Sequence, residues 1–219
     1  MSGFVCIPSI ASADMLHIAH EIDRVRPLDR LHLDIEDGNF VPNITFGIKM
    51  VRQIAEYCGE TIALDAHLMM NNPELWIKPL ADCGVAKLAV HMESVRYPLD
   101  TLSFIKRHGM MAGLALSFAT PAEYLEPFIG SLDYILVMTA EPDGANQCFY
   151  QPILRKLKRI AAMVESHVPI WVDGSIGPDN IAVVARAGAS SAIVGRAVFT
   201  AANPVSSVRE MERIASDTS

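Results

Sequence analysis

Cysteine and basic side chains are both scarce in this sequence. Its four cysteines are spread over 219 residues, and none stands in a CxxC pair. Disulfide frameworks belong to short, cysteine-dense chains, so this usage favours a reduced, cytoplasmic setting. Lysine and arginine number 18 against 25 acidic residues, which leaves a net charge of −7. Nucleic-acid-binding chains carry dense basic clusters instead, so no nucleic acid is expected as a partner.

Long apolar runs are missing as well. No window reaches the ~18 uninterrupted apolar residues of a membrane-spanning helix, so no membrane partner is expected. The N-terminus lacks a charged segment followed by an apolar run, so no signal peptide is predicted. Hydrophobic residues still make up 51% of the chain, which is enough to bury a substantial core.

Short apolar segments alternate with helical patterns along the chain. Eight segments rich in valine, isoleucine and leucine are predicted as strands, at residues 4–7, 31–35, 62–68, 87–91, 112–116, 134–138, 170–172 and 192–194. Helical patterns are predicted at residues 14–25, 49–57, 72–83, 99–107, from 120 onward, 150–167, 178–187 and 205–214. Two helix starts carry capping signals, Asn72 ahead of a proline and Thr120 with Glu123 as a capping box.

Near-continuous apolar strands joined by helices predict a parallel sheet. Eight such units without a linker predict an α/β protein with a single (β/α)8 TIM barrel over residues 1–219. An open doubly wound sheet is the alternative. The first strand-to-helix turn has no glycine fingerprint, which disfavours a dinucleotide-binding version of that alternative.

Polar side chains gather where several predicted strands end. His32 and Asp34 stand two apart, so on a strand they point to the same face. Asp65 with His67, and Asp173 before a glycine, end two other strands. In a barrel the reactive groups come from these C-terminal ends. Two histidines and two aspartates at one rim form a ligand set suited to Zn²⁺, Fe²⁺ or Mn²⁺.

Each of these residues also has an ordinary structural explanation. A lone histidine in an apolar strand is usually a hydrogen-bonded core residue, and an aspartate before glycine usually forms a turn. Their coincidence at one rim favours the metal site. His91 and Glu93, at the end of another strand, are interpreted as a polar pair behind the ligands rather than as ligands.

The stretch HLDIEDGNFVPNIT at residues 32–45, followed by DAHLM at 65–69, resembles the ribulose-phosphate 3-epimerase family. Shorter matches run colinearly from about residue 7 to residue 199, at 8–10, 90–93, 119–121, 137–139 and 172–174. The resemblance implies a metal-dependent (β/α)8 barrel that inverts carbon 3 of ketose phosphates such as ribulose 5-phosphate and xylulose 5-phosphate. It also implies a small-molecule sugar phosphate as partner and suggests a homo-oligomer.

The resemblance further implies roles for individual residues. One divalent metal ion, Zn, Fe, Mn or Co, is expected on His32, Asp34, His67 and Asp173. Asp34 and Asp173 are expected to be the two acid/base residues. The other expected substrate-binding positions, besides His67, are Ser9, Met69, Met138, Gly144, Gly174, Ser175, Gly195 and Arg196.

The reaction explains why these residue types are needed. The proton on carbon 3 becomes acidic only if the enediolate formed by its removal is stabilised, which a Lewis-acidic metal provides. Inversion then needs two carboxylates on opposite faces of the enediolate, one to remove the proton and one to return it. Strands two and seven lie well apart around a barrel, so their aspartates can approach from opposing sides.

The chain departs from the family pattern at the phosphate end. The glycine-rich loop after strand six is replaced by EPDGANQ at residues 141–147, and Ser175 and Arg196 stand where the family usually has glycine and serine. Two interpretations are open. Arg196 either contacts phosphate, or pairs with Glu141 or Asp143 while the site takes another substrate.

Glu36 is a further departure, because the family usually has methionine there. An acid at this position is able to bind a substrate hydroxyl or to raise a neighbour's pKa, but it also suits an outward-facing role. A Schiff-base aldolase is disfavoured, since none of the six lysines ends a predicted strand. A non-catalytic or substrate-shifted sugar-phosphate-binding paralogue is the alternative to the epimerase.

Overall fold

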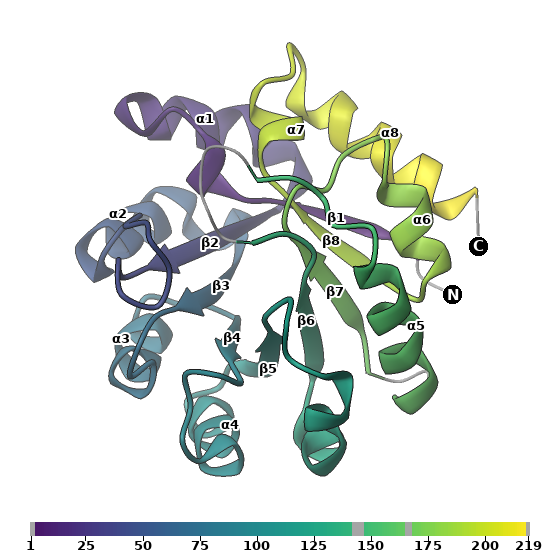
Figure 1. The fold of residues 1–219 in the computed structure, drawn as a ribbon. Helices are drawn as coiled ribbons and strands as arrows, with labels where there is room; N and C mark the ends of the chain where they lie inside the picture. Colours follow the sequence, from purple (N-terminus) through teal and green to yellow (C-terminus); the bar gives the residue numbers. More distant parts are fainter. Residues whose placement is uncertain (1–2, 142–146, 165–167, 218–219) are drawn as a thin grey trace.

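The computed structural model describes residues 3–141, 147–164 and 168–217. Its strands form one parallel sheet in the order β1-β8-β7-β6-β5-β4-β3-β2 (Figure 1). The strands are β1 (Val5–Pro8), β2 (Arg30–Glu36), β3 (Ala63–Met69), β4 (Lys87–His91), β5 (Met111–Leu116), β6 (Tyr134–Met138), β7 (Ile170–Asp173) and β8 (Ser191–Val194). A parallel bridge between Ser9 and His32 joins the two ends of the sheet. The fold is therefore the predicted TIM barrel.

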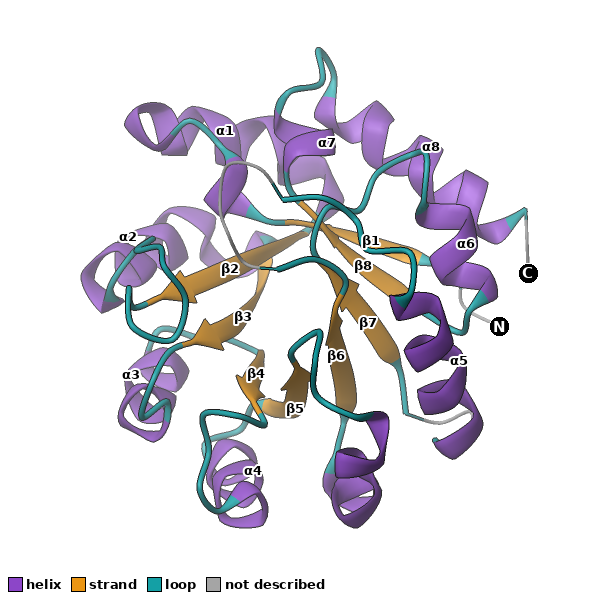
Figure 2. Cartoon of the chain, in the orientation of Figure 1, coloured by secondary structure: helices purple, strands orange, loops and turns teal. Residues whose placement is uncertain are grey.

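Helices surround the strands on the outside of the barrel (Figure 2). They are α1 (Ile18–Val25), α2 (Ile48–Cys58), α3 (Glu74–Asp82), α4 (Pro98–Arg107), α5 (Ile153–Met163), α6 (Ile181–Arg186), α7 (Arg196–Phe199) and α8 (Pro204–Ser216). Short 3₁₀ helices occupy Ile10–Ser12, Met15–His17, Arg26–Leu28, Gly59–Thr61 and Ala122–Ser131. None of the helices described combines the length and apolar character needed to cross a membrane.

Two predicted helix starts are wrong in detail. Thr120 does not cap an α-helix: its hydroxyl donates a hydrogen bond to the Glu93 carboxylate, and the helix that follows has Pro121 at its N-cap. The segment that follows is the 3₁₀ helix Ala122–Ser131, and Pro127 within it lacks the N–H that an α-helix would use. Asn72 does not cap α3 with its side chain either; its backbone carbonyl accepts from the Leu75 N–H at 3.3 Å.

The core has two main parts, besides a small cluster beside the cavity. The larger part lies between the helices and the outer face of the sheet. The smaller part is a cluster of side chains that fill the barrel, consisting of Ile7, Ala89, Ala115, Tyr134, Leu136, Trp171 and Ile193. The Tyr134 and Trp171 rings pack with centroids 4.6 Å apart. This cluster inside the barrel supports the site above it, because barrel interiors are packed layers and not pores.

Gly113 makes room for the cluster inside the barrel, so Gly113→Ala is expected to lower the free energy of unfolding by about 1–3 kcal/mol. An added Cβ would lie 2.4 Å from Cζ of the buried Tyr134 ring, which cannot move away without disturbing Trp171. Gly130→Ala is the matched control, because nothing lies within 4 Å of its added Cβ. Urea unfolding measures both variants, and equal stability of the two would contradict this packing.

Candidate active site

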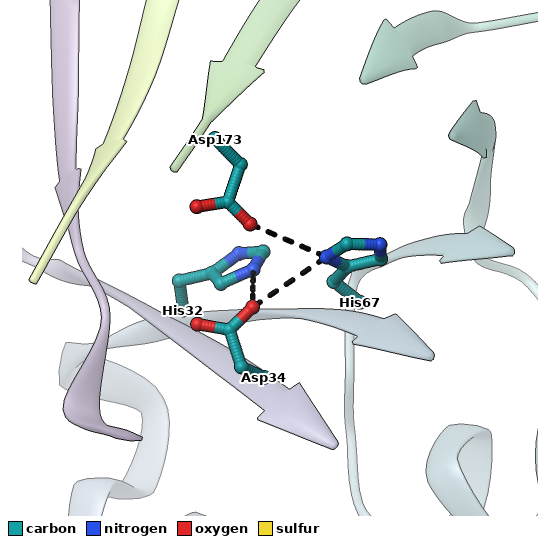
Figure 3. Close-up of side chains that lie close together, drawn as sticks. All are labelled: His32, Asp34, His67 and Asp173. Atoms are coloured by element: carbon teal, nitrogen blue, oxygen red, sulfur yellow. Dashed lines mark hydrogen bonds and ion pairs between the residues drawn. The ribbon is translucent and has the colours of Figure 1, made fainter. Parts of the chain in front are cut away.

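Four predicted side chains converge at the C-terminal ends of the strands. Strand β2 supplies His32 and Asp34, β3 supplies His67 and β7 supplies Asp173 (Figure 3). One potential ligand atom from each residue lies within 4.8 Å of all the others, and all four residues are buried. The register of β2 and β3, which sets Asp34 opposite His67, brings these two together.

The nitrogen and oxygen atoms of the cluster face one another. Asp34 Oδ1 lies 3.1 Å from His32 Nε2 and 3.5 Å from His67 Nδ1. Asp173 Oδ2 lies 3.3 Å from the same His67 nitrogen (Figure 3). That nitrogen is buried and has no hydrogen-bond partner among the described residues. A buried polar atom without a partner is costly, so it indicates a missing ligand between these groups.

The charges in the cluster also fit a cation. Burial opposes ionisation of Asp34, but His32 and His67 hold its pKa well below the usual range. Burial, and then the charge on Asp34, raises the pKa of Asp173. Within the described part of the chain, neither carboxylate pairs with a lysine or an arginine. Two imidazoles and two carboxylates without a basic partner fit a divalent metal such as Zn, Fe, Mn or Co.

Polar partners lie behind both imidazoles of the cluster. His32 Nδ1 forms a short hydrogen bond with Asp65 Oδ1. His67 Nε2 lies 2.9 Å from His91 Nε2, and His91 Nδ1 lies 3.0 Å from Glu93 Oε2. Burial lowers the pKa of His91 to about 4, which leaves the ring neutral. These contacts match the interpretation of His91 and Glu93 as a polar pair behind the ligands, because carboxylates and carbonyls commonly orient metal-binding histidines in this way.

A cavity of about 320 Å³ opens above the cluster. Its lining includes Asp34, Asp173 and most positions expected to bind substrate, namely Ser9, Met69, Met138, Gly174, Ser175, Gly195 and Arg196. His67 lies beneath it, fully buried. Gly144 lies outside the described residues. The Ser9 hydroxyl donates a short hydrogen bond to Asp34 Oδ2.

Glu36 faces this cavity and not the outside of the barrel. Its carboxylate accepts a hydrogen bond of 2.6 Å from Asn43 Nδ2. Burial, and then the charge on Asp34, raises the pKa of Glu36 to about 7. Asn43 was not among the residues singled out from the sequence, although it belongs to the stretch that carries the family resemblance. Ser12 and Gln147 also line the cavity and were also missed.

Arg196 lies at the side of the cavity formed by the ends of β7 and β8. Its Nη2 donates to the Gln147 carbonyl at 2.7 Å and to Ser175 Oγ at 2.9 Å. Ser175 Oγ donates in turn to the same carbonyl at 2.8 Å. Asp143, one of the acids considered as a partner for Arg196, lies outside the described residues. The guanidinium is thus tied to the loops after β6 and β7.

These features define a TIM-barrel protein with a buried histidine–aspartate cluster of the kind that holds a divalent metal. The model of the ribulose-phosphate 3 epimerase family matches residues 5–199. The chain belongs to this family.

Curated relatives extend the similarity over nearly the whole chain. The ribulose-phosphate 3-epimerase of Mycobacterium tuberculosis is 33% identical over 214 residues, covering 96% of this chain and 93% of the relative. The cytoplasmic isoform of ribulose-phosphate 3-epimerase from Oryza sativa subsp. japonica is 36% identical over 203 residues, covering 90% and 88%.

Solved structures agree with the fold. Orotidine 5′-phosphate decarboxylase from Pyrococcus horikoshii superposes with a TM-score of 0.70 at 14% identity, covering 96% of this chain and 99% of that structure. A 3-hexulose-6-phosphate synthase superposes with a TM-score of 0.67 at 16% identity, covering 96% and 97%. Similarity at this level of identity shows the barrel alone.

Divalent metal is expected to raise the thermal unfolding midpoint of metal-stripped protein, because it binds the folded cluster. Free metal at 100 times its Kd should add about 2.7 kcal/mol of stability. Asp173→Asn should lose most of this gain. Asp82→Asn, which removes an exposed carboxylate paired with Lys78, should keep it. Calorimetry with Zn²⁺, Mn²⁺ or Co²⁺ measures the shift, and a midpoint indifferent to every metal would contradict the metal site.

Proposed function

We propose that this protein is a metal-dependent epimerase that inverts carbon 3 of a ketose phosphate, such as ribulose 5-phosphate, xylulose 5-phosphate or a related pentulose or hexulose phosphate. One observation carries the proposal. Asp34 and Asp173 line the same cavity from β2 and β7, which β1 and β8 separate around the barrel. Two carboxylates that reach one space from different sides are what a two-base inversion requires.

The proposed mechanism moves one proton across the substrate. One of the two aspartates removes the carbon 3 proton, and the other protonates the resulting enediolate on the opposite face. The roles exchange when the reaction runs in reverse. A divalent metal bound by His32, Asp34, His67 and Asp173 would act as a Lewis acid toward the negative charge that develops. The hydrogen bond from Ser9 to Asp34 Oδ2 orients that carboxylate.

Apolar side chains keep water from the reacting carbon in this proposal. Met69 and Met138 line the cavity and pack in one buried cluster with Val41. Asp173 is paired in register with Met138, so a carboxylate and a thioether end their strands side by side. An apolar wall of this kind excludes water that would otherwise exchange with the transferred proton.

The phosphate end is assigned to the ends of β7 and β8. Arg196, Ser175, Gly174 and Gly195 line that side of the cavity. A guanidinium offers a charge-assisted contact that compensates for the missing glycine-rich loop. The second candidate function is a paralogue shifted to another substrate or retaining only sugar-phosphate binding, and Glu36 in the cavity favours it, because an additional acid changes which hydroxyl groups the site accepts.

Two general properties are proposed on the family relationship. A cytoplasmic location is proposed because the rice relative is named a cytoplasmic isoform. Self-association into a homo-oligomer follows the resemblance to the family, and light scattering coupled to size exclusion would test it.

Asp34→Asn and Asp173→Asn are each expected to lower the epimerisation rate by about 10²–10⁴-fold, the usual contribution of a positioned acid or base. Exchange of the carbon 3 proton with deuterium from solvent should fall with it, because each residue is also a proposed metal ligand. NMR of a ketose phosphate in deuterated water measures both rates. Near-normal epimerisation in either variant would refute the two-base mechanism, and Asp100→Asn on α4 serves as a control.

Arg196→Gln is expected to raise KM for a phosphorylated ketose by on the order of 10- to 100-fold, with kcat less affected, because a charge-assisted contact is lost. KM for the unphosphorylated ketose should not change. Arg209→Gln on α8, an exposed arginine away from the cavity, is the control. A panel of pentulose and hexulose phosphates supplies the substrates. An equal effect on phosphorylated and free sugars would assign Arg196 to another role.

A further inference from the structure

A line of hydrogen-bonding groups runs from the metal-type cluster to the protein surface. It begins at His67 on β3, continues to His91 on β4 and ends at Glu93, just beyond that strand. His67 and His91 are fully buried, whereas the Glu93 side chain is 26% exposed. The two imidazoles are stacked with centroids 4.8 Å apart and share a contact between their Nε2 atoms.

The donor and acceptor in each hydrogen bond of this line follow from the single proton that each neutral imidazole carries. His67 Nδ1 faces Asp34 and Asp173, so as a metal ligand it must carry a lone pair. A neutral imidazole then holds its proton on Nε2 and donates it to His91 Nε2, 2.9 Å away. His91 must consequently carry its own proton on Nδ1, which lies 3.0 Å from Glu93 Oε2. A carboxylate only accepts, so Glu93 fits the end of the line.

Glu93 is held in place by donors on its other oxygen. The Ser117 N–H donates to Glu93 Oε1 at 2.9 Å, and the Thr120 hydroxyl donates to the same atom. Oε2 is thereby turned toward His91. The arrangement parallels that of His32, whose Nδ1 contacts the Asp65 carboxylate directly. Each histidine of the cluster thus has a carboxylate behind it, with His91 inserted as a spacer in one case.

We propose that Glu93 is a positioning residue that acts through His91 to keep the cluster-facing nitrogen of His67 free of a proton. This role rests on the proposed metal site. It predicts that the isosteric change Glu93→Gln moves the proton of His91 from one ring nitrogen to the other. The Ser117 N–H requires an oxygen opposite it, so the new amide must turn its NH₂ group toward His91.

The amide introduced by Glu93→Gln would exchange the donor and acceptor in each hydrogen bond of this line. An NH₂ donor makes His91 Nδ1 an acceptor, and His91 then carries its proton on Nε2, facing His67. His67 must accept it and hold its own proton on Nδ1, where the metal would bind. Ser117 Oγ, 3.2 Å from His91 Nδ1, offers a substitute acceptor that would weaken the effect. The sharpest comparison is therefore the double variant Glu93→Gln, Ser117→Ala against Ser117→Ala alone.

Two measurements test the proposal. Competition with a chromophoric chelator gives the Zn²⁺ affinity, and ¹⁵N NMR of metal-free protein, at an alkaline pH where imidazoles are neutral, gives the position of the His91 proton. The double variant should bind Zn²⁺ about 10–100-fold more weakly than Ser117→Ala, the range for changes behind metal ligands. Its His91 proton should move from Nδ1 to Nε2. Glu93→Gln alone should fall between the two.

Glu123→Gln is the matched control, because it makes the same change at an exposed carboxylate paired with Arg159. Thermal unfolding confirms that each variant is folded. Equal Zn²⁺ affinities would overturn the role of Glu93, and so would weaker binding with the His91 proton still on Nδ1, since the loss would then be one of charge alone. Failure of the unmodified protein to bind any metal would overturn the metal site itself, and this outcome is distinct from the others.

Discussion

The structure depends on the meeting of two buried carboxylates. Asp34 and Asp173 share one cavity without a lysine or arginine partner among the described residues, and burial makes their like charges costly. Two imidazoles alone relieve this only by taking up protons. A divalent cation held by these residues would offset both charges without protonating either carboxylate. The two carboxylates whose buried charges destabilise the barrel are therefore also the two proposed acid/base residues.

The cluster also bears on how the barrel closes. The ends of the sheet, β1 and β2, meet through the backbone bridge between Ser9 and His32. Side chains reinforce this junction of β1 and β2, because the Ser9 hydroxyl contacts Asp34 and Arg30 Nε donates to the Cys6 carbonyl at 2.9 Å. Strand β2, which carries His32 and Asp34, is thus one of the two strands at the junction. The same strand, β2, therefore contributes both to the site and to the closure of the barrel.

Much of this arrangement could be predicted because it is periodic. The two-residue repeat of a strand puts His32 and Asp34 on one face, and alternation of strands with helices brings the strand ends to one rim. The capping role expected of Thr120 could not be judged locally, since its hydroxyl turns to Glu93, 27 positions earlier in the chain, and Pro121 stands at the N-cap of the helix. Asn43 was missed for a similar reason. Its contact with Glu36 depends on a loop that folds back, with Asp37 bridged to Ile44.

Polarity along the cavity bears on how a substrate would lie in the proposed enzyme. Glu36 and Asn43 supply acceptor and amide groups beside β2, whereas Arg196 supplies donors beside β7 and β8. A ketose phosphate has the same asymmetry, with hydroxyls at one end and an anion at the other. Binding in the reverse sense would set the phosphate against the Asp34 carboxylate, where like charges repel. The two ends of the cavity thus favour one orientation of a ketose phosphate, with its phosphate beside Arg196.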